Sequence, residues 1–266
     1  MKIGIVGCAG RMGQMLVREI LATDGCALAG GTEAPGSDMI GHDVAEIAGG
    51  DAAGLPVGDD AGALFQAADV IIDFTVPAAT AGHAALATEH GCALIVGTTG
   101  LESAHQGALV QASGKAVIVQ AANFSVGVNV LLGLTEQVSG ILADDYDIEI
   151  VEMHHRHKVD APSGTALALG TAAANGRGVD LDTVSERVRD GHIGARTAGY
   201  IGFATLRGGD IAGDHTVIFA GDGERVELTH KAGDRAVFAR GAVRAALWTQ
   251  GQAPGLYSMH DVLGLD

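Results

Sequence analysis

A cluster of basic and polar side chains is the part of the sequence where residues able to do chemistry are most concentrated. The segment from Glu152 to Thr165 holds three histidines, one arginine and one lysine within five consecutive positions. The whole chain of 266 residues has 32 acidic residues against 16 lysines and arginines, a formal net charge of -16. In so acidic a protein, this local group of cations predicts a receptor for an anion. A histidine there, with an ordinary pKa of about 6.5, can supply a proton near neutral pH.

The residues after this cluster predict a cradle for a carboxylate. Ser163 is a typical N-cap residue, so a helix is expected to begin at Gly164. The amides of Gly164 and Thr165 would then point outward, where they can hold a carboxylate beside the ammonium of Lys158. Gly164 has no side chain to keep a ligand away.

Two alternatives stay open for this basic loop. His154, His155 and His157 could bind a metal ion, but no C-x-x-C or H-E-x-x-H pattern accompanies them. The loop could also be purely structural, with its charges solvated or paired to Glu152 and Asp160. We predict a substrate site without a metal.

A glycine loop near the N-terminus has the pattern of a dinucleotide site. Gly7, Gly10 and Gly13 follow a predicted strand and open a predicted helix, where a pyrophosphate needs amides without side chains in the way. Glu33 follows the end of the next strand, about 20 residues beyond the last glycine, where a carboxylate can accept hydrogen bonds from ribose hydroxyls. The spacing departs from the usual fingerprint at its first glycine and the chain has 41 glycines, so the loop alone is also compatible with an ordinary turn. Together, the two features favour a cofactor site.

The surroundings of Glu33 predict which nicotinamide cofactor is used. NADP carries a 2′-phosphate that needs an arginine or lysine, whereas Ala34 follows Glu33 and no lysine or arginine occurs from Glu19 to Gly114. The only nearby cation is Arg11. We therefore predict a preference for NADH, with NADPH possible through Arg11.

The elements that position these residues alternate between strand and helix in the first half of the chain. Alternation predicts a doubly wound parallel sheet covered by helices on both faces. The predicted strands are 2–6, 27–31, 70–74, 93–96 and 116–121, and the predicted helices include 12–22, 78–89 and 103–112. Two turns, Gly97–Gly100 and Ala121–Phe124, follow the last two strands at the ligand-binding edge, where Phe124 could pack near the nicotinamide.

The second half of the chain has a different texture. A helix is expected at 129–142, a strand at 147–152 and a helix from Gly164, followed by strands at 200–206, 215–220 and 224–230 and a helix at 235–250. Strands that follow one another through Gly/Asp turns predict an antiparallel or mixed sheet, and hence a smaller α+β unit. The tail after this last helix is expected to pack on the first domain.

Composition limits the remaining possibilities. The acidic charge repels phosphate backbones and no basic run offsets it, so nucleic acid is not an expected partner. The three cysteines, an odd number in apolar surroundings, fit reduced thiols in a cytoplasmic protein. We expect no signal peptide and no membrane anchor, because the first apolar run is too short and later ones are interrupted.

The segment from Glu152 to Thr165 resembles the signature of bacterial 4-hydroxy-tetrahydrodipicolinate reductases almost residue for residue. The resemblance covers nearly the whole chain: it extends to 7–13, 73–75, 97–100, 123–129, 202–205 and 235–248. It implies NAD(P)H-dependent reduction of a small cyclic hydroxy-dicarboxylate, with loss of water, in lysine and diaminopimelate biosynthesis. It also implies a homotetramer of two-domain subunits, in which 1–125 plus 235–266 hold the dinucleotide and 126–234 hold substrate and tetramer contacts.

The resemblance assigns roles to individual residues. His154 matches a proton donor or acceptor, Lys158 a second proton donor and carboxylate partner, and His155, Gly164 and Thr165 match substrate contacts. The implied cofactor contacts are Gly7, Cys8, Ala9, Gly10, Arg11, Met12, Glu33, Gly97, Thr98, Thr99, Ala121, Ala122, Asn123 and Phe124.

Two residues depart from the pattern of some family members, and both concern NADPH. Ala34 and Val76 stand where some members have an arginine. Two other readings also remain: another nicotinamide-dependent dehydrogenase of a small carboxylic acid, or a noncatalytic dinucleotide-sensing or metal-binding protein. A domain closure that brings hydride donor and acceptor together is expected for the enzymatic reading.

Overall fold

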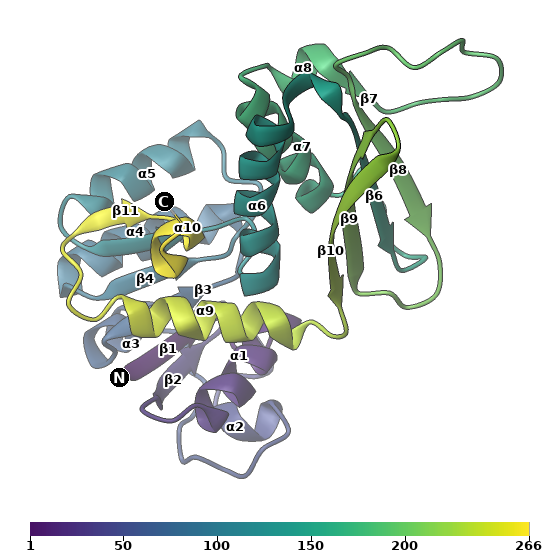
Figure 1. Ribbon diagram of the computed structural model, residues 1–266. Coiled ribbons are helices and arrows are strands. Elements are labelled where there is room, and N and C mark those ends of the chain that lie inside the picture. Colours follow the sequence, from purple (N-terminus) through teal and green to yellow (C-terminus); the bar gives the residue numbers. More distant parts are fainter. Residues whose placement is uncertain (266) are drawn as a thin grey trace. The chain divides into compact units, whose positions relative to one another are not determined.

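The computed structural model describes residues 1–265, which form two compact units (Figure 1). The first unit comprises Met1–Val126 and Ala236–Gly264, and the second comprises Gly127–Arg235 with Leu265. No helix in the described part of the chain is long and apolar enough to cross a membrane. Each unit has its own sheet and its own hydrophobic core.

A parallel sheet of six strands forms the centre of the first unit, in the order β11-β5-β4-β3-β1-β2. The strands are β1 (Lys2–Val6), β2 (Ala27–Thr32), β3 (Val70–Asp73), β4 (Ala93–Val96), β5 (Val117–Gln120) and β11 (Gly255–Tyr257). The five strands predicted from the sequence are confirmed to within one residue at either end. The tail does pack on this unit, as β11, which was not predicted because three residues are too few to show a period.

Helices cover both faces of this sheet (Figure 1). They are α1 (Arg11–Ala22), α2 (Val44–Ile47), α3 (Ala61–Ala67), α4 (Pro77–His90), α5 (Ser103–Ser113), α9 (Ala236–Trp248) and α10 (Met259–Leu263). Neighbouring residues of one strand point into the two cores on opposite faces of the sheet. Ile72 packs in the cluster with α1 and α9, whereas Ile71 packs in the cluster with α3, α4 and α5. Burial on both faces explains why the strands read as continuous apolar runs.

The order of the strands creates a switch point between β1 and β3. From β1 the chain moves to β2 on one side, and then crosses back to β3 on the other. In open parallel sheets, ligands bind at the carboxyl ends of the strands where the order reverses. The segments that leave these two ends are the glycine loop Gly7–Gly13 and the turn after Asp73.

A mixed sheet of five strands forms the second unit, in the order β10-β9-β6-β8-β7. Its elements are α6 (Val126–Leu142), the 3₁₀ helix η1 (Ala143–Asp145), β6 (Asp147–His154), α7 (Gly164–Arg177), α8 (Leu181–Val184), β7 (Ser185–Glu186), β8 (Ile201–Arg207), β9 (Gly213–Gly221) and β10 (Glu224–Ala232). The predicted mixed sheet is confirmed: β8 runs parallel to β6, whereas β9 runs antiparallel to it. Successive strands β8 and β9 are not neighbours, because β6 lies between them.

The central strand β6 begins in the hydrophobic core of this unit and ends among buried polar side chains. Its alternate residues Ile148, Ile150, Glu152 and His154 are buried, and the first two belong to the cluster that packs against α7. Side chains two apart share one face of a strand. The face that begins as hydrophobic core therefore ends in a buried carboxylate and a buried imidazole.

Candidate active site

Glu152 is the centre of the polar end of the second unit. Its side chain is 1 % exposed, and its two oxygens accept from both terminal nitrogens of Arg207 at 2.7 and 2.8 Å. The amide of Ser163 donates to Oε1 at 3.0 Å, and Nδ1 of His154 lies 2.5 Å from Oε2. Burial alone would raise the pKa of Glu152, but these partners, Arg207 foremost, lower it below its usual value.

His154 lies in a buried setting shared with strand β9. The ring of His215 meets it edge to face, with centroids 5.1 Å apart. Gly213, opposite the end of β6, leaves room for the imidazole, because a Cβ at this position would be 2.9 Å from Nε2 of His154. Burial is the main cause that lowers the pKa of His215, to about 4, and the nearby His154 lowers it further. His215 is therefore neutral at physiological pH.

The helix after the basic loop begins at Gly164, where the sequence placed it. Ser163 caps α7, with its Oγ accepting from the amide of Ala166 at 3.1 Å and lying 3.0 Å from Nε2 of His215. Gly164 is exposed, and a Cβ there would meet no atom within 4 Å. The start of α7 is therefore held in place by Ser163, while Gly164 leaves it accessible to a ligand.

The cations of the loop are partly engaged with neighbouring carboxylates. Nζ of Lys158 lies 2.7 Å from Oδ1 of Asp160, a pairing that the structural alternative for this loop anticipated. Nη2 of Arg235 approaches Nε2 of His155 to 3.4 Å, and partial burial together with this guanidinium lowers the pKa of His155. The described residues offer no group of three histidine, cysteine, aspartate or glutamate side chains suited to a metal ion.

A pocket of about 480 Å³ occupies the switch point of the first unit. Three of the residues predicted to bind the cofactor line it, Gly7, Gly10 and Glu33. Its other walls are formed by Val6, Thr32, Ala34, Pro35, Asp59, Ala61, Phe74, Thr75, Val76, Ala79 and His83. None of these described lining residues is a lysine or an arginine.

The glycine loop has the geometry of a pyrophosphate cradle. Gly7 has a φ of 72°, in the left-handed region, and a Cβ on Gly13 would lie 2.2 Å from the carbonyl oxygen of Gly7. Gly10 caps α1 without a side-chain hydrogen bond, so the first amides of the helix face outward. Glu33 Oε1 accepts from the amide of Ala9 at 2.7 Å, which ties the loop to the end of β2.

A buried carboxylate to which sequence reasoning gave no role lies behind this pocket and contacts two of its lining residues, Thr75 and His83. Asp73 is fully buried at the end of β3, and its oxygens contact the hydroxyls of Thr75, Thr80 and Thr98 at 2.6, 2.9 and 3.1 Å. Nδ1 of His83, which lines the pocket, lies 2.8 Å from it. The available signal was a charged residue that directly ends an apolar strand.

The remaining predicted cofactor residues differ in how far their side chains are exposed. Cys8 is fully buried, so only its backbone is available to a ligand, and Arg11 is exposed. The ring of Phe124 is 1 % exposed and packs in the core against Phe74, with centroids 5.5 Å apart. The packing of this ring near the nicotinamide stays a prediction. Gly97 is required by packing, because a Cβ there would lie 2.3 Å from the ring of Phe74.

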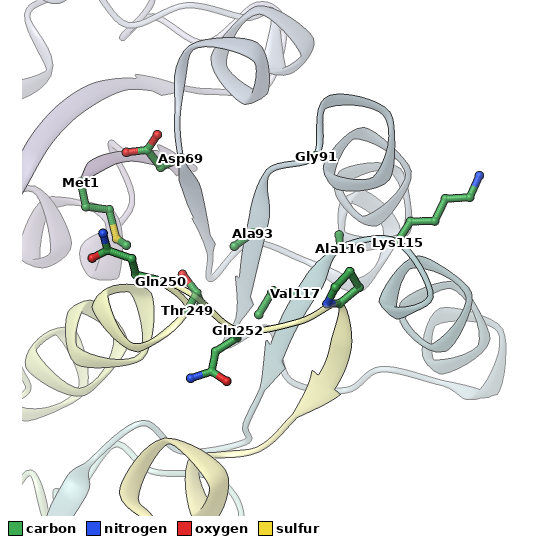
Figure 2. A pocket seen from close by; sticks show the side chains of 11 residues that line it. Met1, Asp69, Gly91, Ala93, Lys115, Ala116, Val117, Thr249, Gln250 and Gln252 are labelled. Atoms are coloured by element: carbon green, nitrogen blue, oxygen red, sulfur yellow. The ribbon is translucent and has the colours of Figure 1, made fainter.

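A second pocket, of about 500 Å³, lies at the opposite edge of the same sheet (Figure 2). Met1, Asp69, Ala93 and Ala116 line it at the amino ends of the strands, together with Gln250 and other residues after α9. Ligands of doubly wound folds bind at the carboxyl ends, so the switch-point pocket remains the candidate cofactor site.

A parallel sheet with a glycine loop at its switch point is the architecture of nicotinamide-dependent oxidoreductases, and this is the class of protein that the first unit defines. Family models narrow the class. The dihydrodipicolinate reductase N-terminus model matches residues 1–124, and the C-terminus model matches residues 127–263. The chain belongs to the dihydrodipicolinate reductase family.

Similar proteins agree with this membership. The chain is 58 % identical over 263 residues to the 4-hydroxy-tetrahydrodipicolinate reductase of Ruegeria pomeroyi, covering 99 % of this chain and 98 % of the relative. It is 54 % identical over 265 residues to the enzyme of the same name from Afipia carboxidovorans, covering 100 % and 97 %. The solved dipicolinate-bound dihydrodipicolinate reductase of Paenisporosarcina sp. TG-14 has a TM-score of 0.75 at 24 % identity over 97 % of each chain, which shows the shared fold.

Proposed function

We propose that this protein reduces 4-hydroxy-tetrahydrodipicolinate to tetrahydrodipicolinate, with loss of water, using NADH in preference to NADPH. The reaction belongs to lysine and diaminopimelate biosynthesis. The observation that carries the proposal is the polar end of the second unit, where a carboxylate-held imidazole lies on β6 and the open start of α7 follows a lysine-bearing loop. Full-length relatives that bear this enzyme's name support it.

The substrate is a dicarboxylate, and the loop offers matching donors. The amides of Gly164 and Thr165 begin α7, where the helix dipole favours a negative group. The ammonium of Lys158, which contacts an exposed aspartate, can exchange that partner for a substrate carboxylate. Nδ1 of His155 and Nδ1 of His215 are buried without a partner among the described residues, as expected for groups that await a polar ligand.

His154 is the proposed proton donor or acceptor. Its imidazole is shielded from bulk water, with 11 % exposure of the side chain, and it is paired to a carboxylate that can stabilise the protonated ring. Lys158 is the proposed second proton donor. Loss of the substrate hydroxyl as water requires such a proton, because hydroxide is a poor leaving group.

The residues of the first unit fit a nicotinamide dinucleotide. The glycine loop would receive the pyrophosphate, since a Cβ on Gly7 or Gly13 would collide with Thr75 or with the loop's own backbone and prevent this tight turn. Glu33 keeps one carboxylate oxygen beside its bond to Ala9 and would accept from a ribose hydroxyl. When bound, the reduced nicotinamide supplies the hydride.

The proposed NADH preference depends on the charges around the pocket. Glu33, Ala34 and Val76 line the wall expected to face the adenosine ribose, and they offer a carboxylate and two apolar groups. A 2′-phosphate there would meet a negative charge without a fixed cation. Arg11, exposed at the glycine loop, is the proposed route to limited NADPH use.

We further propose a homotetramer in which the first unit holds the cofactor and the second holds substrate and intersubunit contacts. Support comes from the sheet face opposite the helices in the second unit. Leu206 is 48 % exposed there, and it pairs with Met153 on the neighbouring strand. Exposed apolar side chains such as Leu206 are suited to burial against another copy.

A coupled assay tests the proposed function. The upstream synthase generates the unstable substrate in place, and the decrease in NADH absorbance is followed with NADPH in a parallel reaction. We expect turnover that depends on the synthase, with a higher kcat/KM for NADH. Absence of synthase-dependent oxidation with both cofactors would refute the proposed reaction, and a tenfold higher kcat/KM for NADPH would refute the preference.

A further inference from the structure

We propose that Glu152, clamped by Arg207, is a positioning residue that fixes the tautomer of His154 and the start of α7 together. The inference rests on the proposed function, because it assigns proton transfer to His154. It concerns how one buried carboxylate couples the acid–base group to the carboxylate cradle.

The first step is the hydrogen-bond inventory of Glu152. Arg207 donates two hydrogen bonds to it and the Ser163 amide donates a third. A guanidinium and a backbone N–H can only donate, and the fixed positive charge of Arg207, bound through two hydrogen bonds, holds the carboxylate in its ionised form. A bidentate guanidinium also offsets the cost of burying this charge at 1 % exposure.

The second step follows for His154. An ionised carboxylate can only accept, so the 2.5 Å contact requires the imidazole to carry its proton on Nδ1. Nε2 is then the nitrogen that gains or loses a proton during the reaction. Gly213 leaves the space beside Nε2, where a Cβ would lie at 2.9 Å.

The third step links this imidazole to the cradle. Oε1 of Glu152 accepts from the Ser163 amide, and Ser163 in turn caps α7 and contacts His215. Movement of the carboxylate would therefore displace both the proton-transfer group and the first amides of the helix. Proton transfer needs groups held within a few tenths of an ångström, so this shared anchor has a catalytic consequence.

Other charges around His154 do not replace this role. On neighbouring strands, Arg207 contributes a fixed positive charge and His215 is neutral, while Lys158 in the loop is paired to Asp160. Glu152 is the only carboxylate in direct contact with the His154 ring among the described residues.

Glu152→Gln tests the proposal, with Glu149→Gln as its matched control. Glu149 lies on the same strand and also pairs with arginine, in its case with both Arg189 and Arg196, but it does not contact His154. In Glu152→Gln an amide N–H₂ must face either Arg207 or Nδ1 of His154, which disfavours the working tautomer. We expect kcat to fall at least about tenfold, and the acidic limb of the pH profile of kcat/KM to move, because the site loses a buried negative charge. Glu149→Gln should keep both within about twofold.

Two further variants keep the test decisive if Glu152→Gln does not fold. Arg207→Gln should lower kcat and alter the pH profile, because the carboxylate loses its clamp. Glu152→Asp, which retains the charge, should keep the limb near its original pH while kcat falls. A normal pH profile and kcat in Glu152→Gln, or in Arg207→Gln where the former is unfolded, would overturn the positioning role. Failure of the unaltered enzyme to turn over the substrate would instead overturn the proposed function, so the two failures are distinguishable.

Discussion

At the scale of single residues, His154 and Lys158 make separable contributions to the proposed reaction. His154→Gln keeps a polar side chain but removes proton transfer, so kcat should fall about a hundredfold. Lys158→Ala removes a cation from the carboxylate cradle, so KM should rise as well. Steady-state kinetics with the synthase-coupled assay measure both. Lys231→Ala, at an exposed lysine on β10, is the control for loss of charge alone. Near-normal constants in both site variants would contradict these roles.

Cofactor preference is also a residue-scale property. Ala34→Arg together with Val76→Arg places two guanidiniums at the wall of the switch-point pocket. The ratio of kcat/KM for NADPH over NADH should rise at least about tenfold, because each charged hydrogen bond to a phosphate contributes about 1.5 to 3 kcal/mol. Val76 and Val110 are 57 % and 59 % exposed. Val110→Arg therefore adds the same charge at equal exposure away from the pocket, and should leave the ratio unchanged.

The sequence located the basic loop but not the partners that organise it. Residues from His154 to Thr165 are contiguous, so their types and the N-cap signal of Ser163 were visible. Arg207 and His215 come from strands more than fifty positions later, and only the pairing of β6 with β8 and β9 brings them to Glu152. Single-chain periodicity carries no information on which strands become neighbours, so these contacts could not be predicted.

At the scale of secondary-structure elements, α9 depends on one close backbone approach. A Cβ on Gly241 would lie 1.6 Å from the carbonyl oxygen of Phe124. Gly241→Ala must therefore push the helix away from the turn that follows β5, at a cost of about 1 to 3 kcal/mol or more. The fluorescence of Trp248, the single tryptophan of the chain and a member of α9, reports this loss during denaturation.

Gly107 provides the matched control for that substitution. It lies within α5, and a Cβ there would meet nothing within 4 Å. Gly107→Ala should stabilise the first unit by up to about 1 kcal/mol, because alanine restricts the unfolded chain and favours helix. The same chemical change therefore has opposite signs in two helices. A lower midpoint for both variants would show that glycine packing is not the cause.

Elements were predicted well where their pattern was strong. Buried parallel strands are apolar runs bounded by Gly and Asp, so β1, β3 and β4 were evident. α6 begins at Val126, three residues earlier than predicted, because Gly127 weakens the helical signal at its start. The short helices α2 and α3 have one or two turns and too few apolar positions to show a period.

At the scale of the whole molecule, the histidines of the second unit make stability depend on pH. His215 is 4 % exposed and has a pKa of about 4 in the folded protein, against about 6.5 when unfolded. Above pH 6.5 both states are neutral at this position and the shift has no effect. Below it the unfolded chain binds a proton that the folded chain excludes, so stability falls as pH decreases from about 6.5 to 4, by at most about 3 kcal/mol.

The overall charge does not supply this effect. The formal charge of -16 at pH 7 declines toward zero near the sequence pI of 4.9, so mutual repulsion within the chain weakens over the same interval. The acid-induced loss of stability should therefore be local to the second unit.

Hydrogen exchange of peptides from β6 and β9, measured between pH 7 and 4 and corrected for the intrinsic exchange rate, should show decreasing protection. His215→Gln should flatten that dependence whatever its stability at pH 7, whereas His192→Gln, in an exposed loop, should retain it. An equal dependence in peptides from β1 and β3 would instead assign the effect to the charge of the whole chain.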